Sequence, residues 1–361
     1  MYYTTPFTAK SNVHNNKIVK STNKLLLIRD NLMDTRSKNI QQLNGGSKMP
    51  TIAGHHHISM ITKNAQQNVH FYRDKLGLRL VKKTVNQEDP SMHHLFYGDE
   101  TGSPGTSLTF FAMPYVGSTY RGTNAITRIG LLVKNEEALT YWKKRFEQLV
   151  IQHGAFIDYS GKKALPFQDP DGLELLLIDG AGEEIPSFWK TWEKSAVPQN
   201  YQILGMGPVE MTAKRPKKLI NMLRDLFGYE KVENSEPEKR YKSVLGALYS
   251  EIVIKEKDGE TEKPGRGSID HLAIRVKDVQ EMQQWEKKIK ERGYSSTDII
   301  NRYYFHSLYF RDANGIKFEL ATDGPGLHID EQFENLGESL VLPPFLEGKR
   351  QDIEAKLTPI E

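Results

Sequence analysis

Residues 69–81 read VHFYRDKLGLRLV, and residues 220–232 read INMLRDLFGYEKV, with Arg-Asp, Gly and the final Val at matching positions. A second match joins residues 167–173 (FQDPDGL) to residues 310–316 (FRDANGI). Self-similarity of this kind is the sequence signature of a repeated structural unit. The matches divide the chain into four units, near residues 53–113, 125–179, 203–255 and 268–322.

Each unit has the same predicted order of elements. A short alternating strand precedes a helical pattern of about 12–15 residues, and further strand-like runs follow, the last of them after a Gly turn. A glycine stands near the end of each helical pattern, where it can adopt the left-handed capping conformation. These glycines are Gly77, Gly154, Gly228 and Gly293. The sequence therefore predicts an α+β fold of four βαβββ modules.

The domain organisation follows from this repeat. We expect a first domain at residues 53–180 (modules 1 and 2), a second at 203–323 (modules 3 and 4), and a C-terminal tail at 324–361. Residues 1–48 show no sustained period of either 3.6 or 2 and no secretory signal, so we expect a disordered or non-native leader.

Composition excludes several classes of site and partner. The chain of 361 residues contains no Cys, which excludes disulfides, iron–sulfur clusters and cysteine nucleophiles. Residues 1–48 carry eight of the 49 basic and two of the 46 acidic side chains, leaving 41 and 44 in the body. The body is therefore mildly acidic, and no basic stripe predicts nucleic-acid binding. No apolar run reaches the ~20 residues of a membrane helix, so we expect a cytoplasmic protein without a membrane partner.

Three potential metal ligands share a predicted strand face. Side chains alternate along a strand, so His57 and His271 lie opposite the apolar faces of their strands, as does Glu319. Two imidazoles and one carboxylate with open positions suit a non-haem iron(II) or a related divalent ion.

The repeat indicates which modules provide these ligands. Arg128 and Leu176 replace His271 and Glu319 in module 2, Pro208 replaces His57 in module 3, and Thr109 replaces Glu319 in module 1. Modules 1 and 4 together supply two His and one Glu. We therefore expect modules 1 and 4 to form one cupped sheet around a metal, and modules 2 and 3 to form a metal-free scaffold.

The body resembles the vicinal-oxygen-chelate (glyoxalase/bleomycin resistance/dioxygenase) superfamily, and within it the ring-cleaving dioxygenases that act on hydroquinones. The resemblance covers residues 52–355 and implies βαβββ modules paired into two open, barrel-like sheets. The segments that carry it are 55–59 (HHHIS), 94–100 (HLFYGDE), 102–106 (GSPGT), 270–271 (DH), 301–305 (NRYYF), 310–312 (FRD), 318–319 (FE), 336–338 (LGE) and 342–344 (LPP).

The resemblance also implies roles for individual residues. The metal ligands would be His57, His271 and Glu319. The catalytic positions around them would be His56, Ser59, Asp270, Arg302 and Tyr309. Asp270 stands where the hydroquinone enzymes have His, and Ser59 stands where they have Thr. For His94 and His306 we favour structural roles.

The implied activity is cleavage of an aromatic diol, either a hydroquinone or a catechol, by O2 at Fe(II), with Mn(II) as the alternative metal. The family association is with quinone detoxification. The implied partner is a small aromatic diol substrate. Assembly into a homo-oligomer is an open alternative. Two other functions stay open as well: a glyoxalase-like isomerase or metal-dependent thiol transferase, and a non-catalytic small-molecule-binding member. An isomerase needs a second carboxylate, and Thr109 at the corresponding position of module 1 disfavours it.

Overall fold

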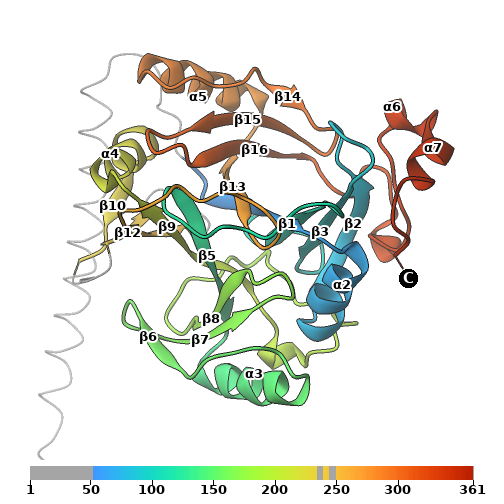
Figure 1. Cartoon of the computed structure of the whole chain (residues 1–361), viewed down its shortest axis with the longest axis horizontal. Helices are drawn as coiled ribbons and strands as arrows, with labels where there is room; N and C mark the ends of the chain where they lie inside the picture. Colours follow the sequence, from blue (N-terminus) through green and yellow to red (C-terminus); the bar gives the residue numbers. More distant parts are fainter. Residues whose placement is uncertain (1–51, 234–238, 244–248, 361) are drawn as a thin grey trace, which may run out of the picture. The chain divides into compact units, whose positions relative to one another are not determined.

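The computed structural model describes residues 52–233, 239–243 and 249–360, so the leader expected at residues 1–48 lies outside the described part. The strands of these residues form two sheets of eight (Figure 1). One sheet has the order β14-β15-β16-β13-β1-β4-β3-β2, and the other has the order β10-β11-β12-β9-β5-β8-β7-β6.

Modules 1 and 4 build the first sheet. Module 1 comprises β1 (His55–Thr62), α2 (Ala65–Val69) continued by the π-helical turn η1 (His70–Lys75), β2 (Arg79–Val85), β3 (His93–Gly98) and β4 (Ser107–Ala112). Module 4 comprises β13 (Ile269–Val276), α5 (Val279–Glu291), β14 (Ile300–Asn301), β15 (Phe305–Arg311) and β16 (Lys317–Pro325). Strands β1 and β13 run antiparallel side by side and join the two modules.

Modules 2 and 3 build the second sheet, joined by the antiparallel pair β5 and β9. Module 2 comprises β5 (Ala125–Val133), α3 (Glu136–Gln148), β6 (Ile157–Tyr159), β7 (Lys162–Gln168) and β8 (Glu174–Asp179). Module 3 comprises β9 (Gly205–Ala213), α4 (Pro216–Phe227), β10 (Tyr229–Lys231), β11 (Lys239–Ser243) and β12 (Glu251–Glu256). The βαβββ order and the sheet pairing of modules 1 and 4 are as predicted.

Strand register confirms the internal alignment. Within module 4, Glu319 of β16 lies opposite Ala273, two residues after His271. Within module 1, Thr109 of β4 lies opposite Ser59, two residues after His57. The predicted correspondence of Thr109 with Glu319 therefore holds at the level of the backbone.

The repeated turn has the same hydrogen bonds in modules 2 and 4. Asp169 Oδ1 accepts from the backbone N–H groups of Asp171 and Leu173, at 2.9 and 2.8 Å. Asp312 Oδ1 accepts from Asn314 and Ile316, both at 2.9 Å. Because an Asp side chain can replace a backbone acceptor in a turn, the matched sequence motif becomes a matched turn before the last strand.

Apolar faces of helices and strands fill the core. Helix α3 begins at Asn135, whose side chain accepts from Ala138 N, and buries Trp142 and Phe146. Helix α5 begins in the same way at Asp278 and buries Trp285. A side-chain acceptor at the N-cap satisfies a backbone N–H that the helix leaves unpaired. The strand faces opposite His57 and His271 join this core, as the alternation predicted.

The expected cap at Gly154 is wrong. Gly228 follows α4 with φ +72°, but α3 is closed by Val150, which has φ +53°. Backbone bonds Val150 N to Glu147 O and Ile151 N to Phe146 O form a Schellman turn around Val150. Ile151 is buried and anchors the turn, which therefore occurs four residues earlier than the glycine indicated.

Val150→Gly should stabilise the protein by about 1 kcal/mol, because the left-handed conformation is costly for a residue with a Cβ and accessible to glycine. The Val150 side chain is 90% exposed and loses little packing when removed. Urea unfolding of the wild type and the variant measures the change. Val150→Ala keeps a Cβ and serves as the control with a near-zero effect; equal stability of the two variants would contradict the prediction.

The remaining described segments connect and cover the sheets. The connection at residues 180–204 contains a 3-10 turn, and Trp189 from it packs against Gly205, where a Cβ would clash with the ring. The short elements outside the modules are η2 (Gln199–Tyr201), η3 (Phe333–Asn335), α6 (Pro344–Glu347) and α7 (Arg350–Glu354). Among the described residues, none of the helices has the length and apolarity to cross a bilayer.

Candidate metal centre

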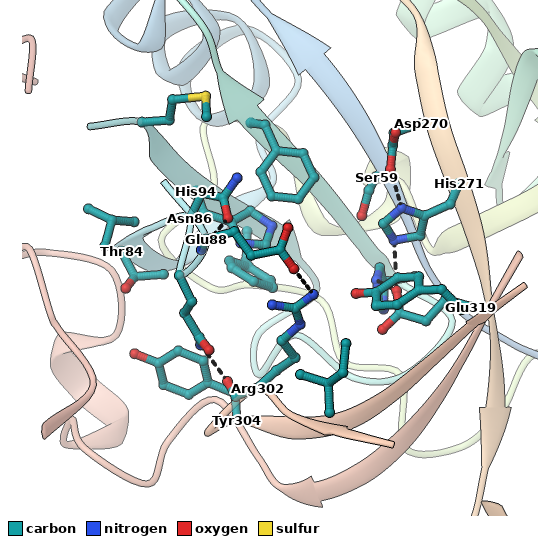
Figure 2. Close-up of a pocket in the computed structure, with 18 of the residues that line it drawn as sticks. Ser59, Thr84, Asn86, Glu88, His94, Asp270, His271, Arg302, Tyr304 and Glu319 are labelled. Carbon is teal, nitrogen blue, oxygen red and sulfur yellow. Dashed lines mark hydrogen bonds and ion pairs between the residues drawn. The ribbon is translucent and has the colours of Figure 1, made fainter. Parts of the chain in front are cut away.

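Three central strands of the first sheet bring the predicted ligands together. His57 comes from β1, His271 from β13 and Glu319 from β16. One ligand atom from each lies within 4.8 Å of the others, and all three side chains are buried. Figure 2 labels two of them, His271 and Glu319. The cluster combines modules 1 and 4, whose sequences lie at opposite ends of the repeat.

The donor atoms of the cluster point at one another. Glu319 Oε2 lies 2.7 Å from His271 Nε2 and 3.1 Å from His57 Nε2. His271 Nε2 and Glu319 Oε2 nevertheless lack a hydrogen-bond partner of good geometry among the described residues. Buried polar atoms without partners are costly. Two imidazoles and one carboxylate that converge in this way fit a divalent cation of the iron or manganese type.

Hydrogen bonds behind the cluster fix the orientation of His271. Its Nδ1 lies 2.6 Å from Asp270 Oδ2, and Lys317 Nζ donates to the same oxygen at 2.8 Å. Burial alone would raise the pKa of Asp270, but His271 and Lys317 hold it well below its usual range. An ionised Asp270 accepts the Nδ1 hydrogen, so Nε2 is turned toward the cluster, as in metal-binding histidines generally.

His57 and Glu319 are oriented by neighbours too. His57 Nδ1 lies 2.9 Å from His56 Nδ1, and burial lowers the pKa of His56 to about 3, so His56 is neutral and can accept a hydrogen. Ser307 Oγ donates to Glu319 Oε1 at 2.5 Å, which leaves Oε2 toward the two imidazoles.

The charges within the cluster shift its pKa values in opposite directions. Burial would raise the pKa of Glu319, yet His57 and His271 hold it well below its usual range. Burial would lower the pKa of His271, but Glu319 and Asp270 raise it overall. The carboxylate is therefore ionised at neutral pH, which is the form that binds a cation.

A cavity of about 470 Å³ opens in front of the cluster. Its lining includes the three candidate ligands and four of the predicted catalytic residues, Ser59, Asp270, Arg302 and Tyr309. Aromatic side chains form much of the remaining wall; they are Phe96, Phe111, Tyr304 and Phe305. The cavity therefore has the size and lining of a site for one small, mostly apolar molecule.

The sequence matches the Glyoxalase/Bleomycin resistance protein/Dioxygenase superfamily over residues 54–177 and 205–320. The chain belongs to this superfamily. Its relatives include MhqA of Bacillus subtilis (strain 168), whose name proposes a ring-cleaving dioxygenase; it is 42% identical over 316 residues, which cover 86% of this chain and 99% of the relative. The chlorohydroquinone/hydroquinone 1,2-dioxygenase of Sphingobium indicum is 28% identical over 84% of this chain and 95% of its own length.

A solved structure shows the same superfamily fold. The crystal structure of a B. subtilis protein, titled as a proposed dioxygenase, superposes with a TM-score of 0.80 at 34% identity. The superposition covers 86% of this chain and 98% of that one. The four-module arrangement of this superfamily member is therefore shared over nearly the whole described region.

Arg302 and Tyr309 lie together on the cavity wall of this superfamily member. The Arg302 guanidinium lies 5.5 Å from the centre of the Tyr309 ring, and its Nη2 donates to Glu88 Oε1 at 2.6 Å (Figure 2). Burial raises the pKa of Tyr309, so its hydroxyl keeps its proton. Ser59 Oγ lies 2.7 Å from Thr109 Oγ1, which positions the serine beside the cluster.

His56 lies away from this cavity. It lines a second cavity of about 590 Å³, on which His328 and Leu327 also lie. The register of β1 against β13 shifts between His55 and His57, so His56 is the extra residue of a β-bulge. A bulge redirects a side chain. His56 therefore supports His57 and does not line the cavity as the other predicted catalytic residues do.

Several residues that line the cavity or support the cluster were not predicted. Lys317 stands two positions before Glu319 on β16, so strand alternation alone could have placed it on the same face. Ser307 and Glu88 gave no such signal, because their contacts depend on how β15 and the loop before β3 approach the site. His94, for which we favoured a structural role, lines the cavity, whereas His306 does not.

Proposed function

We propose that the protein is a ring-cleaving dioxygenase of aromatic diols of the hydroquinone or catechol type. His57, His271 and Glu319 would hold Fe(II), with Mn(II) as the alternative. The observation that carries this proposal is the convergence of two imidazoles and one carboxylate on a point that faces a cavity lined by aromatic rings. The names of the relatives agree with it.

The chemistry that the ion supplies when bound is the redox coupling between a diol and dioxygen. The chain itself binds and orients the diol. The rings of Phe96, Phe111 and Phe305 offer apolar walls to an aromatic substrate and exclude water from it. The Tyr309 hydroxyl, which keeps its proton, can donate a hydrogen bond to an anionic oxygen.

Asp270 forms a partly buried charged network with His271 and Lys317 at the edge of the cavity. Asp270 is ionised and bound to both His271 and Lys317. We propose that Asp270 serves mainly to hold His271 in place, and that proton acceptance from the diol falls to other groups on the wall. The resemblance implies a catalytic position for Asp270, and this proposal gives it a positioning role instead.

The two alternative functions predict different measurements. A glyoxalase-like isomerase needs a second carboxylate, and Thr109 at that position is engaged with Ser59. An isomerase consumes no oxygen. A non-catalytic binding member would hold its ligand equally well without a metal, and it has no need of three converging donor atoms.

The proposal is tested by oxygen uptake. The purified chain is loaded with Fe(II) under nitrogen, freed of excess metal, and mixed in air-saturated buffer with hydroquinone or catechol. We expect stoichiometric oxygen consumption and a ring-opened product with at least one diol. Mn(II)-loaded and metal-free protein are measured in parallel. Absence of uptake with both diols in both metal forms would overturn the dioxygenase assignment.

A further inference from the structure

His94 lies in the middle of the cavity wall formed by module 1. It is on β3, opposite Thr84 of β2 and opposite Phe111 of β4. Its ring stacks on Phe111, with centroids 4.3 Å apart, and contacts Phe96 at 4.1 Å. The two phenyl rings hold the imidazole in one orientation, because aromatic contacts at this distance are close-packed.

The half-buried His94 has no hydrogen-bond partner at Nε2 among the described residues, whereas His55 and His93 each pair one ring nitrogen and leave only Nδ1 without a partner. His55 Nε2 pairs with the Tyr229 hydroxyl at 3.0 Å, and His93 Nε2 pairs with the Thr358 carbonyl at 2.8 Å. His94 Nε2 is buried without a hydrogen-bond partner among the described residues. An unsatisfied buried polar group costs about 1–3 kcal/mol. A phenylalanine or leucine would fill this aromatic niche without that cost, so packing alone does not explain a histidine.

His94 lies across the cavity from the candidate metal ligands, where it can contact a bound ligand. Figure 2 shows His94 on the side of the cavity where Asn86 and Glu88 lie, whereas His271 and Glu319 lie on the other side. A ligand that reaches from the cluster across the cavity therefore meets this wall.

Three other polar side chains of that wall form hydrogen bonds within the protein, whereas Thr84 Oγ1, on the strand position opposite His94, lacks a partner among the described residues. Glu88 accepts from Arg302 at 2.6 Å, and Gln87 donates to the Arg302 carbonyl, also at 2.6 Å. Asn86 Oδ1 accepts from the backbone N–H of Glu88 at 3.0 Å. Burial lowers the pKa of His94 well below its usual value. Its neutral ring therefore offers one N–H and one lone pair to a ligand.

The two classes of diol differ in what they require of this wall. A 1,2-diol carries both oxygens at one end of the ring, where both can reach the metal cluster. A 1,4-diol carries its second hydroxyl at the opposite end, where it needs a partner of its own. We propose that His94 binds the hydroxyl para to the oxygen held at the cluster, and thereby selects 1,4-diols over 1,2-diols. This inference rests on the proposed function and specifies its substrate class.

The test compares two ligands that differ by this one hydroxyl. Hydroquinone and phenol are titrated by calorimetry into the Fe(II)-loaded protein under nitrogen. For a neutral hydrogen bond we expect the wild type to bind hydroquinone about three- to tenfold more tightly than phenol. In His94→Phe this ratio should fall to about one while the affinity for phenol is retained. His94→Gln keeps a polar group and should retain part of the preference.

The matched control is His306→Phe, a histidine in the same sheet that does not line the cavity, and it should keep the wild-type ratio. A wild-type ratio near one, or an unchanged ratio in His94→Phe, would overturn the inference. Because the titration consumes no oxygen, its result is independent of ring cleavage. Loss of the preference in His94→Phe without any oxygen uptake would support the subsite and overturn only the proposed reaction.

Discussion

His271→Ala should lower the affinity for a divalent metal by more than about 100-fold, since changes in the groups that merely support metal ligands already cost 10- to 100-fold. The variant loses one of three donor atoms that lie within 4.8 Å of one another. It also leaves Asp270 with Lys317 as its remaining partner on that side. Metal content after gel filtration of the Fe(II)-loaded protein measures the loss, and oxygen uptake with hydroquinone should disappear with it.

The control is His306→Ala, which removes an imidazole from β15 of the same sheet. This variant should keep its metal and its oxygen uptake. Full metal occupancy in His271→Ala would show that the cluster is an ordinary buried ion pair. Ligand affinity that survived in metal-free His271→Ala protein would favour the non-catalytic binding function.

Lys82→Met should destabilise the protein by about 3–5 kcal/mol, the usual cost of removing one partner from a buried ion pair. Lys82 lies on β2 with a side chain that is 0% exposed. Its Nζ donates to Asp330 at 2.6 Å and also to Glu331, and it lies 4.9 Å from the centre of the Tyr304 ring. Without Lys82, two largely buried carboxylates of the C-terminal tail lose their countercharge.

Urea unfolding of the full chain measures this effect. Adding Asp330→Asn and Glu331→Gln to Lys82→Met should recover part of the lost stability, because the unpaired charges are then removed. Lys163→Met is the surface control: Lys163 pairs with Glu136 on exposed side chains and should change stability by less than about 1 kcal/mol. If Lys82→Met and Lys163→Met were equally mild, the pair at Lys82 would not hold the tail.

The fold was largely predictable because the sequence repeats the same βαβββ pattern in four modules. The match between residues 69–81 and 220–232 fixed the module, and alternation then placed His57, His271 and Glu319 on one face. The absence of matching ligands in modules 2 and 3 pointed to the pairing of modules 1 and 4, which the strand order shows.

The features that were missed depend on local backbone geometry or on distant partners. The bulge that redirects His56 inserts one residue into an otherwise regular strand, and no residue type marks it. The left-handed turn at Val150 is set by the burial of Ile151 rather than by a glycine. The burial of Lys82 and the unpaired state of His94 are visible only when the tail and the facing strands are in place.

In the sequence, modules 2 and 3, which form the second sheet, lie between modules 1 and 4, which form the first. A growing chain that has emerged from the ribosome as far as Glu256 contains every strand of the second sheet, but only the module 1 half of the first. Closing β1 against β13 then joins distant positions, a step whose entropic cost rises only slowly with the length of the loop. The candidate ligands are complete only when Glu319 of the last strand is added. A chain that ended before that residue could fold its second sheet and still hold no metal at this site, so metal loading would report on synthesis of the whole body.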